Sequence, residues 1–260
     1  MSYVFELTYP GVWLEDPDRD WAWDVQTLVD QLESLIADAA LALSLFEQAL
    51  RDLLEPSGSN QPGADADHWQ EAWREAVERG ELDPSSAVAV YEWALETERT
   101  GRREMWRAGH LPKSYRHRLP FIHARSYLFT MDRLERHVGV LASMSRMPQA
   151  VVDAPQALRN LMPQLRGVRN SVAHVEDRIR GLGRDGRPLD LKPMENRLVS
   201  APGGVLAIEN LCGNLFGSTM ADGSYGEVEV SAAALQQVAA LVQQIIDAFE
   251  WTGPVRHEPT

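Results

Sequence analysis

The sequence predicts a mainly α protein: a helical bundle with a small inserted β-hairpin and an N-terminal helical extension. Along most of the chain, apolar residues recur at every third or fourth position, which places them on one side of a helix. Strict alternation of polar and apolar residues, typical of a half-buried strand, is clear only at Tyr225–Ser231. With 44% hydrophobic and 24% charged residues, the composition is that of a globular protein.

An acidic helical region is expected over residues 1–115. Residues 1–20 carry prolines among aromatic and acidic residues, and predict an irregular segment with one short strand at Tyr3–Leu7. Trp21–Leu54 keeps the helical spacing throughout, and so broad an apolar face on so long a helix needs partners along its length. Residues 55–66 are rich in Gly, Pro and Ser and predict a loop.

Two further helices are expected in this region, at Asp67–Arg79 and from Asp83 to about Arg107. Asp83 followed by Pro84 predicts the start of the second helix, because aspartate is a favoured N-cap and proline a favoured first helical residue. Four tryptophans could stack on nucleic-acid bases, but their helical spacing beside aliphatic residues favours packing in the core: Trp69, Trp73, Trp93 and Trp106.

The bundle itself is expected over residues 116–254, with a tail at 255–260. A basic connector at Arg107–Arg118 leads into a helix at Leu119–Ser145. This helix should pack antiparallel against the next one through a connector at Met147–Pro155.

A β-hairpin is expected near residues 214–231, before the last helix. Asp222 and Gly223 supply its turn, and Ser231 is the expected N-cap of the last helix. Cys212 is the only cysteine, and its apolar neighbours predict a structural role at a strand edge. A single cysteine excludes an intramolecular disulfide and fits a reducing compartment.

The start of the chain has no basic segment ahead of an apolar run, and no apolar stretch approaches the length of a membrane span. We therefore expect a cytoplasmic protein that does not contact a membrane.

A helix from about Leu158 to Leu182 is expected to carry the chemistry of the chain. Its apolar residues keep an unbroken 3-4 spacing that marks one buried face: Leu158, Leu161, Leu165, Val168, Val172, Val175, Ile179 and Leu182. A second line with the same spacing points away from that face: Pro163, Gly167, Asn170, His174, Asp177 and Gly181.

Asn170 and His174 lie four residues apart and are therefore neighbours on one helical surface, with Arg169 at its edge. Gly167 and Gly181 have no side chains at the two ends of this surface. Such a layout suits a second surface that packs closely, and from it we infer a symmetric dimer with a site at the seam.

The run Arg169-Asn170-Ser171-Val172-Ala173-His174 resembles the Arg-x4-6-His signature of the HEPN family (higher eukaryotes and prokaryotes nucleotide-binding domain). The resemblance covers roughly residues 117–250 by order of elements, but its specific part is only this run. The spacing also occurs at Arg118 and His123. The resemblance implies a metal-independent ribonuclease, often a toxin or antiviral effector with an antitoxin or other protein partner, in which arginine and histidine meet across a homodimer.

Metal-free RNA cleavage needs a group that exchanges protons near neutral pH and a positive charge beside the phosphate. His174 is the candidate general base or acid, and Arg169 the candidate for holding the phosphate and stabilising the transition state. Asn170 could orient the imidazole or donate to the phosphate, and the resemblance points to the same position. Asp177 could accept a hydrogen bond from the imidazole, with a surface ion pair as the alternative.

The charge of the chain is unevenly distributed. Its net charge of −13 comprises −17 in residues 1–100, +10 in residues 101–200 and −6 in residues 201–260. The basic third contains the motif and could attract RNA, although acidic and basic parts could equally neutralise each other within the fold or across a dimer. The candidates for contacts with the RNA backbone are Lys113, Arg116, Arg118 and Arg166.

Other site chemistries fit the sequence less well. The histidines include no His-x3-His pair, no His-Glu-x-x-His and no repeated Glu-x-x-His, so no metal or cofactor is expected. Ser171 lies near His174 without a nucleophile elbow. Two alternatives to the enzyme remain open: a non-catalytic HEPN-like module that binds protein or nucleic acid, and an unrelated helical protein whose polar face forms a dimer contact.

Overall fold

The computed structural model describes residues 2–54, 62–196 and 198–260 of the chain, without the side chains of residues 62–69 and 185. Most of the loop expected at residues 55–66 therefore lies outside the described residues, and its last part already belongs to a helix. Within the described ranges, no helix is both long enough and apolar enough to cross a lipid bilayer.

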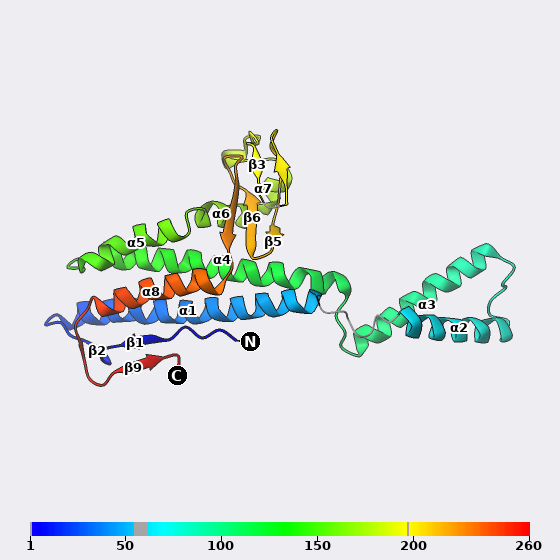
Figure 1. Cartoon of the computed structure of the whole chain (residues 1–260), viewed down its shortest axis with the longest axis horizontal. Helices are drawn as coiled ribbons and strands as arrows, with labels where there is room; N and C mark the ends of the chain where they lie inside the picture. Colours follow the sequence, from blue (N-terminus) through cyan, green and yellow to red (C-terminus); the bar gives the residue numbers. More distant parts are fainter. Residues whose placement is uncertain (1, 55–61, 197) are drawn as a thin grey trace. The chain divides into compact units, whose positions relative to one another are not determined.

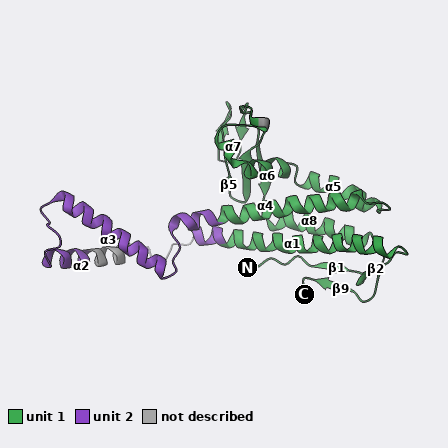
Figure 2. Ribbon diagram, turned by 180° about the vertical axis from the view of Figure 1, so that it is seen from behind, with its two compact units in different colours: residues 1–48, 120–260 green, residues 49–119 purple. Residues whose placement is uncertain are grey.

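The chain divides into two compact units. Unit 1 comprises Met1–Gln48 and Pro120–Thr260, and unit 2 comprises Ala49–Leu119 (Figure 2). This division differs from the boundary expected between residues 115 and 116. The first helix shares the core of the C-terminal region, so the N-terminal residues belong to the bundle and do not form an extension of it.

Unit 1 is mainly helical, as predicted. The helices α1 (Arg19–Leu54), α4 (Lys113–Ser143), α5 (Gln149–Leu161) and α8 (Ala232–Asp247) lie alongside one another in unit 1, and the end of α1 and the start of α4 belong to unit 2 (Figure 1). Their apolar stripes meet in one core, and the stripe predicted for the helix after residue 119 is confirmed, since all its members are buried: Ala124, Tyr127, Met131, Leu134, Val138 and Leu141.

Two helix starts differ from the expected ones. α4 begins at Lys113, so the basic end of the expected connector is helical and Pro120 lies inside the helix. α5 begins at Gln149, within the expected Met147–Pro155 connector, and Pro155 is accommodated inside it. Pro155 is the seventh residue of its helix and Pro120 the eighth, so each lies past the first turn and leaves one carbonyl of the preceding turn without its helical amide donor.

The two ends of the chain form strands that pair with each other. β1 (Leu7–Tyr9) pairs antiparallel with β9 (Arg256–Glu258), and β2 (Trp13–Leu14) with β8 (Trp251–Thr252). The expected irregular start and C-terminal tail are therefore wrong at these residues, and the short strand expected at Tyr3–Leu7 is found later in the chain, at Leu7–Tyr9. The Arg256 guanidinium lies 4.0 Å from the centre of the Tyr9 ring and 2.8 Å from Asp30, which fixes β9 against α1.

The predicted hairpin is confirmed and gains a third strand. β6 (Leu215–Thr219) pairs with β7 (Tyr225–Glu229), and β5 (Asn210–Cys212) adds to the free edge of β6. Cys212 is buried at this edge. Ser231 caps α8, since its hydroxyl accepts a hydrogen bond from the Ala234 amide at 3.1 Å. The segment before the hairpin contains a short 3-10 helix and two short paired strands: Arg184–Gly186, β3 (Met194–Glu195) and β4 (Ser200–Ala201).

Unit 2 contains α2 (Pro62–Glu78) and α3 (Ala87–Arg107). Ser86 caps α3, and the expected N-cap, Asp83, instead accepts hydrogen bonds from the amide and hydroxyl of Ser85. A local Asx turn therefore delays the helix by one turn. The rings of Trp73 and Trp93 pack edge to face with centroids 5.4 Å apart, but both side chains are only half-buried, so this contact meets the core interpretation in part. Trp106 is exposed and Trp69 lies outside the described side chains.

Tyr127 gives a first testable prediction. Its side chain is fully buried, yet its hydroxyl has no hydrogen-bond partner among the described residues. Burial raises the pKa of this hydroxyl, and the Glu229 carboxylate raises it further. An unsatisfied buried hydroxyl destabilises the folded state, so Tyr127→Phe should leave the free energy of unfolding unchanged or raise it by up to about 1 kcal/mol.

Urea unfolding followed by circular dichroism measures this change. Tyr115→Phe serves as the control, because Tyr115 is exposed near the start of α4. A loss of more than about 1 kcal/mol in Tyr127→Phe would show that the hydroxyl is hydrogen-bonded in solution.

Candidate functional site

The motif lies on α6 (Leu165–Ala173), which packs against the hairpin. Leu165, Val168 and Val172 are buried on the side of α6 that faces β6 and β7. The expectation of one buried face is therefore confirmed for this helix.

The single helix expected from Leu158 to Leu182 is wrong, because the chain breaks twice in this segment. The first break lies at Met162–Gln164, between α5 and α6. Pro163 has no amide hydrogen to donate and disfavours the helical conformation of the residue before it, and Met162 accordingly has φ −133° and ψ 67°. The predicted stripe is consequently interrupted, and Leu161 and Ile179 are exposed.

The second break lies at His174, between α6 and α7 (Val175–Ile179), where φ is −124° and ψ is 43°. Arg178, a buried residue of α7, spans the break. Its Nε lies 3.4 Å from the Ser171 hydroxyl on α6, and its Nη1 donates to the Leu182 carbonyl beyond α7. These two bonds join α6, α7 and Leu182 across the break.

The break leaves the His174 side chain 60% exposed. The His174 amide still donates to the Asn170 carbonyl at 3.1 Å, so the residue ends α6 while its imidazole projects into solvent. The carboxylate of Glu176 lies 3.9 Å from its Nδ1, too far for a hydrogen bond. An accessible imidazole at a fixed backbone position is suited to exchanging protons with a bound substrate.

Arg169 is held by α4. Its Nη2 donates to Asp132 Oδ1 at 2.8 Å, and its side chain is only 14% exposed. The Nε of Arg169 is buried and has no hydrogen-bond partner among the described residues. The sequence analysis did not identify Asp132 as a functional residue, because only the fold brings it beside the motif.

Asp132 is part of a larger charged cluster between α4 and α6. Its Oδ2 accepts a hydrogen bond from Arg136 Nε at 3.0 Å. Glu135, about one turn further along α4, lies 3.8 Å from Arg166. Both carboxylates are buried, whereas Arg136 and Arg166 are exposed. Burial raises the pKa of Asp132, and the positive charges of Arg136 and Arg166 oppose that rise. The cluster fixes Arg169 and presents two further guanidinium groups to solvent.

Asn170 and Asp177 are placed differently from the expectation. Asn170 is half-buried on α6, and its carbonyl receives the His174 amide. Asp177 lies 3.7 Å from Arg180, so the surface ion pair describes it better than support of the imidazole. Ligand atoms of His174, Glu176 and Asp177 lie within 4.8 Å of one another, but exposed acidic groups commonly gather in this way without a cation.

The two glycines of the motif surface have explanations within one chain. A Cβ at Gly167 would clash with the Met220 sulfur of the hairpin, so this glycine allows the sheet to approach α6. Gly181 has φ +70° and receives the end of α7, its amide donating to the Arg178 carbonyl. These glycines therefore do not support a dimer seam.

The expected RNA-backbone residues fall into two groups. Arg166 belongs to the charged cluster of unit 1. Lys113, Arg116 and Arg118 occupy the first turns of α4, in unit 2.

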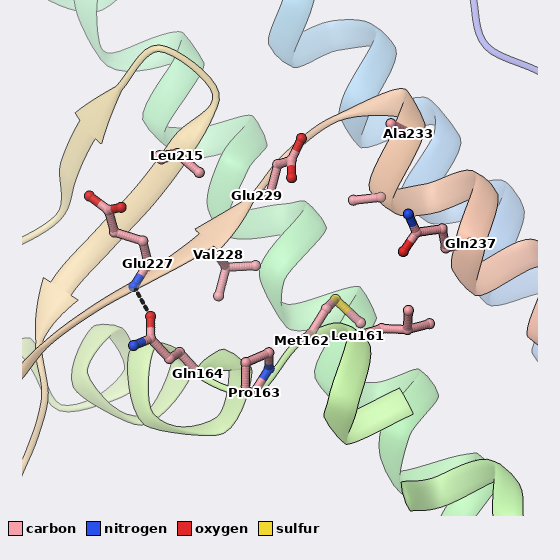
Figure 3. A pocket seen from close by; sticks show the side chains of 11 residues that line it. Leu161, Met162, Pro163, Gln164, Leu215, Glu227, Val228, Glu229, Ala233 and Gln237 are labelled. Atoms are coloured by element: carbon pink, nitrogen blue, oxygen red, sulfur yellow. Dashed lines mark hydrogen bonds between the residues drawn. The ribbon is translucent and has the colours of Figure 1, made fainter. Parts of the chain in front are cut away.

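A cavity of about 350 Å³ opens beside the start of α6 (Figure 3). The break between α5 and α6, the hairpin and the first turn of α8 line it, and the Glu227 amide donates to the Gln164 side chain across it at 2.6 Å. The only sequence signal for this cavity is Pro163, which forces the break.

Comparison of the chain with protein-family models, with curated proteins and with solved structures finds no match. The candidate site of this protein is therefore defined by its own geometry: an exposed histidine at a helix break and, on the same helix, an arginine held by a buried aspartate.

Proposed function

We propose that this chain is a metal-independent endoribonuclease of HEPN type that acts as a cytoplasmic homodimer, as a toxin or antiviral effector. The observation that carries this proposal is the break at His174, which exposes the imidazole while Asp132 holds Arg169 on the same helix. The resemblance of the Arg169–His174 run to the family motif supports the same assignment.

In the proposed reaction, the 2′-hydroxyl attacks the adjacent phosphorus and the bond to the 5′-oxygen breaks. The products are a 2′,3′-cyclic phosphate and a 5′-hydroxyl. One neutral imidazole takes the proton from the 2′-hydroxyl, and one protonated imidazole gives a proton to the leaving oxygen. Because one His174 cannot hold both protonation states at once, the two copies of a homodimer would share these duties.

Arg169 would bind the phosphate and stabilise the charge of the transition state. Asp132 engages its Nη2, which leaves Nη1 for a phosphate oxygen and fixes the plane of the guanidinium. Asn170, one turn before His174, would donate its side-chain amide to the same phosphate. Arg136 and Arg166 add exposed positive charge that would attract the RNA backbone, so binding should weaken as salt is raised.

Cleavage of RNA by the purified full chain in the presence of a chelator tests the proposal. We expect the wild type to cleave total RNA, and His174→Ala and Arg169→Ala each to lower the rate at least about a hundredfold. Arg159→Ala serves as the control, because Arg159 is an exposed arginine of α5 outside the charged cluster. Retained cleavage in His174→Ala would reject its assigned role.

One observation favours a second function, a non-catalytic module that binds protein or nucleic acid, including an antitoxin. Asp132 neutralises Arg169, and the Arg169 side chain is only 14% exposed, which limits its access to a phosphate. Binding of RNA without cleavage by a folded wild type would support this second function and reject the enzyme.

A further inference from the structure

α3 is a long helix with no buried residue, although it carries several large apolar side chains. Val88 is 67% exposed, Tyr91 64% and Trp106 48%. Helices in proteins gain most of their stability by packing an apolar face against another element. The exposed apolar residues of α3 therefore call for a surface that covers them.

The side of α3 that faces α2 is marked by Trp93, whose ring packs on Trp73. At about 100° per residue, Val88 and Trp106 point in the same direction as each other and about 140° away from Trp93. Tyr91, Glu92, Leu95, Arg99, Arg102 and Arg103 lie within about 60° of that direction. We call these eight residues the outer face of α3.

Charge is separated along the outer face. Its only acid, Glu92, lies in the first half of the helix, and its basic residues, Arg99, Arg102 and Arg103, lie in the second half. Glu92 forms no ion pair with the residues that the structure describes. Arg102 lies 3.5 Å from Glu98, and both side chains are exposed, so this contact contributes little and can rearrange.

We propose that the outer face of α3 is a homodimer interface, in which α3 pairs antiparallel with α3 of a second copy of this chain. A two-fold axis at the level of Thr97, the middle residue of α3, brings each residue opposite the one equally far from the middle in the partner. Glu92 of one copy then meets Arg102 of the other, and Val88 meets Trp106. Both contacts occur twice, so acid faces base and apolar faces apolar.

The same register explains the remaining members of the outer face. Tyr91 lies opposite Arg103 and beside Arg102 of the second copy, where a guanidinium can stack on its ring. Leu95 lies opposite Arg99 of the second copy, and the aliphatic part of the Arg99 side chain can cover Leu95. The Arg99 guanidinium can at the same time keep its ion pair with Glu96 of its own chain, at 3.5 Å. A parallel pair would instead place like charges against each other.

Analytical ultracentrifugation of the full chain over a range of concentrations tests the interface. We expect the wild type to be a dimer, and Glu92→Arg and Arg102→Glu each to weaken dimerisation at least about tenfold, because each places like charges together twice. An equimolar mixture of the two variants should recover the dimer, since both opposed pairs then carry opposite charges. Glu71→Arg, an exposed site on α2, is the matched control and should leave the mass unchanged.

Circular dichroism confirms that each variant keeps its helices. A monomeric wild type, a dimeric Glu92→Arg variant, or a mixture that stays monomeric would each overturn the proposal. Loss of RNA binding by Glu92→Arg or Arg102→Glu at unchanged mass would also overturn it and assign the face to nucleic acid. These measurements do not depend on cleavage, so they are informative even if the proposed ribonuclease activity fails its own test.

Discussion

Asp132→Ala is expected to lower the free energy of unfolding by about 3–5 kcal/mol, because it leaves the mostly buried Arg169 guanidinium without its carboxylate. The same change releases Arg169 from its fixed position, so RNA cleavage should also fall at least about tenfold at temperatures where the variant is folded. Urea unfolding and the chelator-resistant cleavage assay measure the two effects separately.

A double variant distinguishes the role of Asp132 in stability from its role in the reaction. In Asp132→Leu/Arg169→Met both charges are removed together, and apolar groups of similar size replace them. Such replacements are often neutral for stability, so we expect most of the lost free energy to return while cleavage stays absent.

Asp153→Ala is the matched control, because Asp153 is exposed on α5 and accepts one hydrogen bond from Gln149. Its stability should change by no more than about 0.5 kcal/mol. An Asp132→Ala variant as stable as this control would show that Arg169 finds water or another partner without Asp132.

Gly223→Ala is expected to destabilise the protein by about 2–4 kcal/mol. Gly223 has φ +81°, a conformation that is strained for residues with a side chain, and a Cβ there would clash with the backbone carbonyl of Asp190. Relieving this clash would require the backbone of the turn to move. Two hydrogen bonds oppose that movement: the Gly223 carbonyl accepts from the Lys192 amide at 3.0 Å, and the Gly223 amide donates to the Met220 carbonyl at 3.0 Å.

Alanine substitutions at two other glycines distinguish the cost of the backbone conformation from the cost of the clash, in the same unfolding experiment. Gly213 has φ +64° but open space around its Cβ position, so Gly213→Ala should show the conformational cost alone, about 1–2 kcal/mol. Gly139 lies inside α4 with open space, and alanine there should be neutral or stabilising by up to about 1 kcal/mol. Equal effects at Gly223 and Gly213 would show that the turn moves freely away from Asp190.

Because Met220 packs on Gly167, the hairpin turn is linked to the motif helix. Distortion at Gly223 should therefore also reduce RNA cleavage if the proposed function is correct.

The sequence by itself determined the elements whose signal is local. The 3-4 spacing located the core face of α4, and Ser231 located the start of α8, because helical periodicity and capping depend on residues a few positions apart. Alternation and the Asp222-Gly223 turn located the hairpin for the same reason. The sequence also identified Arg169, Asn170 and His174 as candidate site residues, because the chemistry of a side chain follows from its residue type.

Only the tertiary structure decided the features that depend on residues far apart in the chain. The terminal strands exist because β1 pairs with β9, which lies some 250 positions later in the chain. Asp132 became part of the site because α4 packs on α6, 37 residues away in sequence. Periodicity reports which side of an element is buried, but it does not report which element covers that side. The covering element is what brings Asp132 to Arg169.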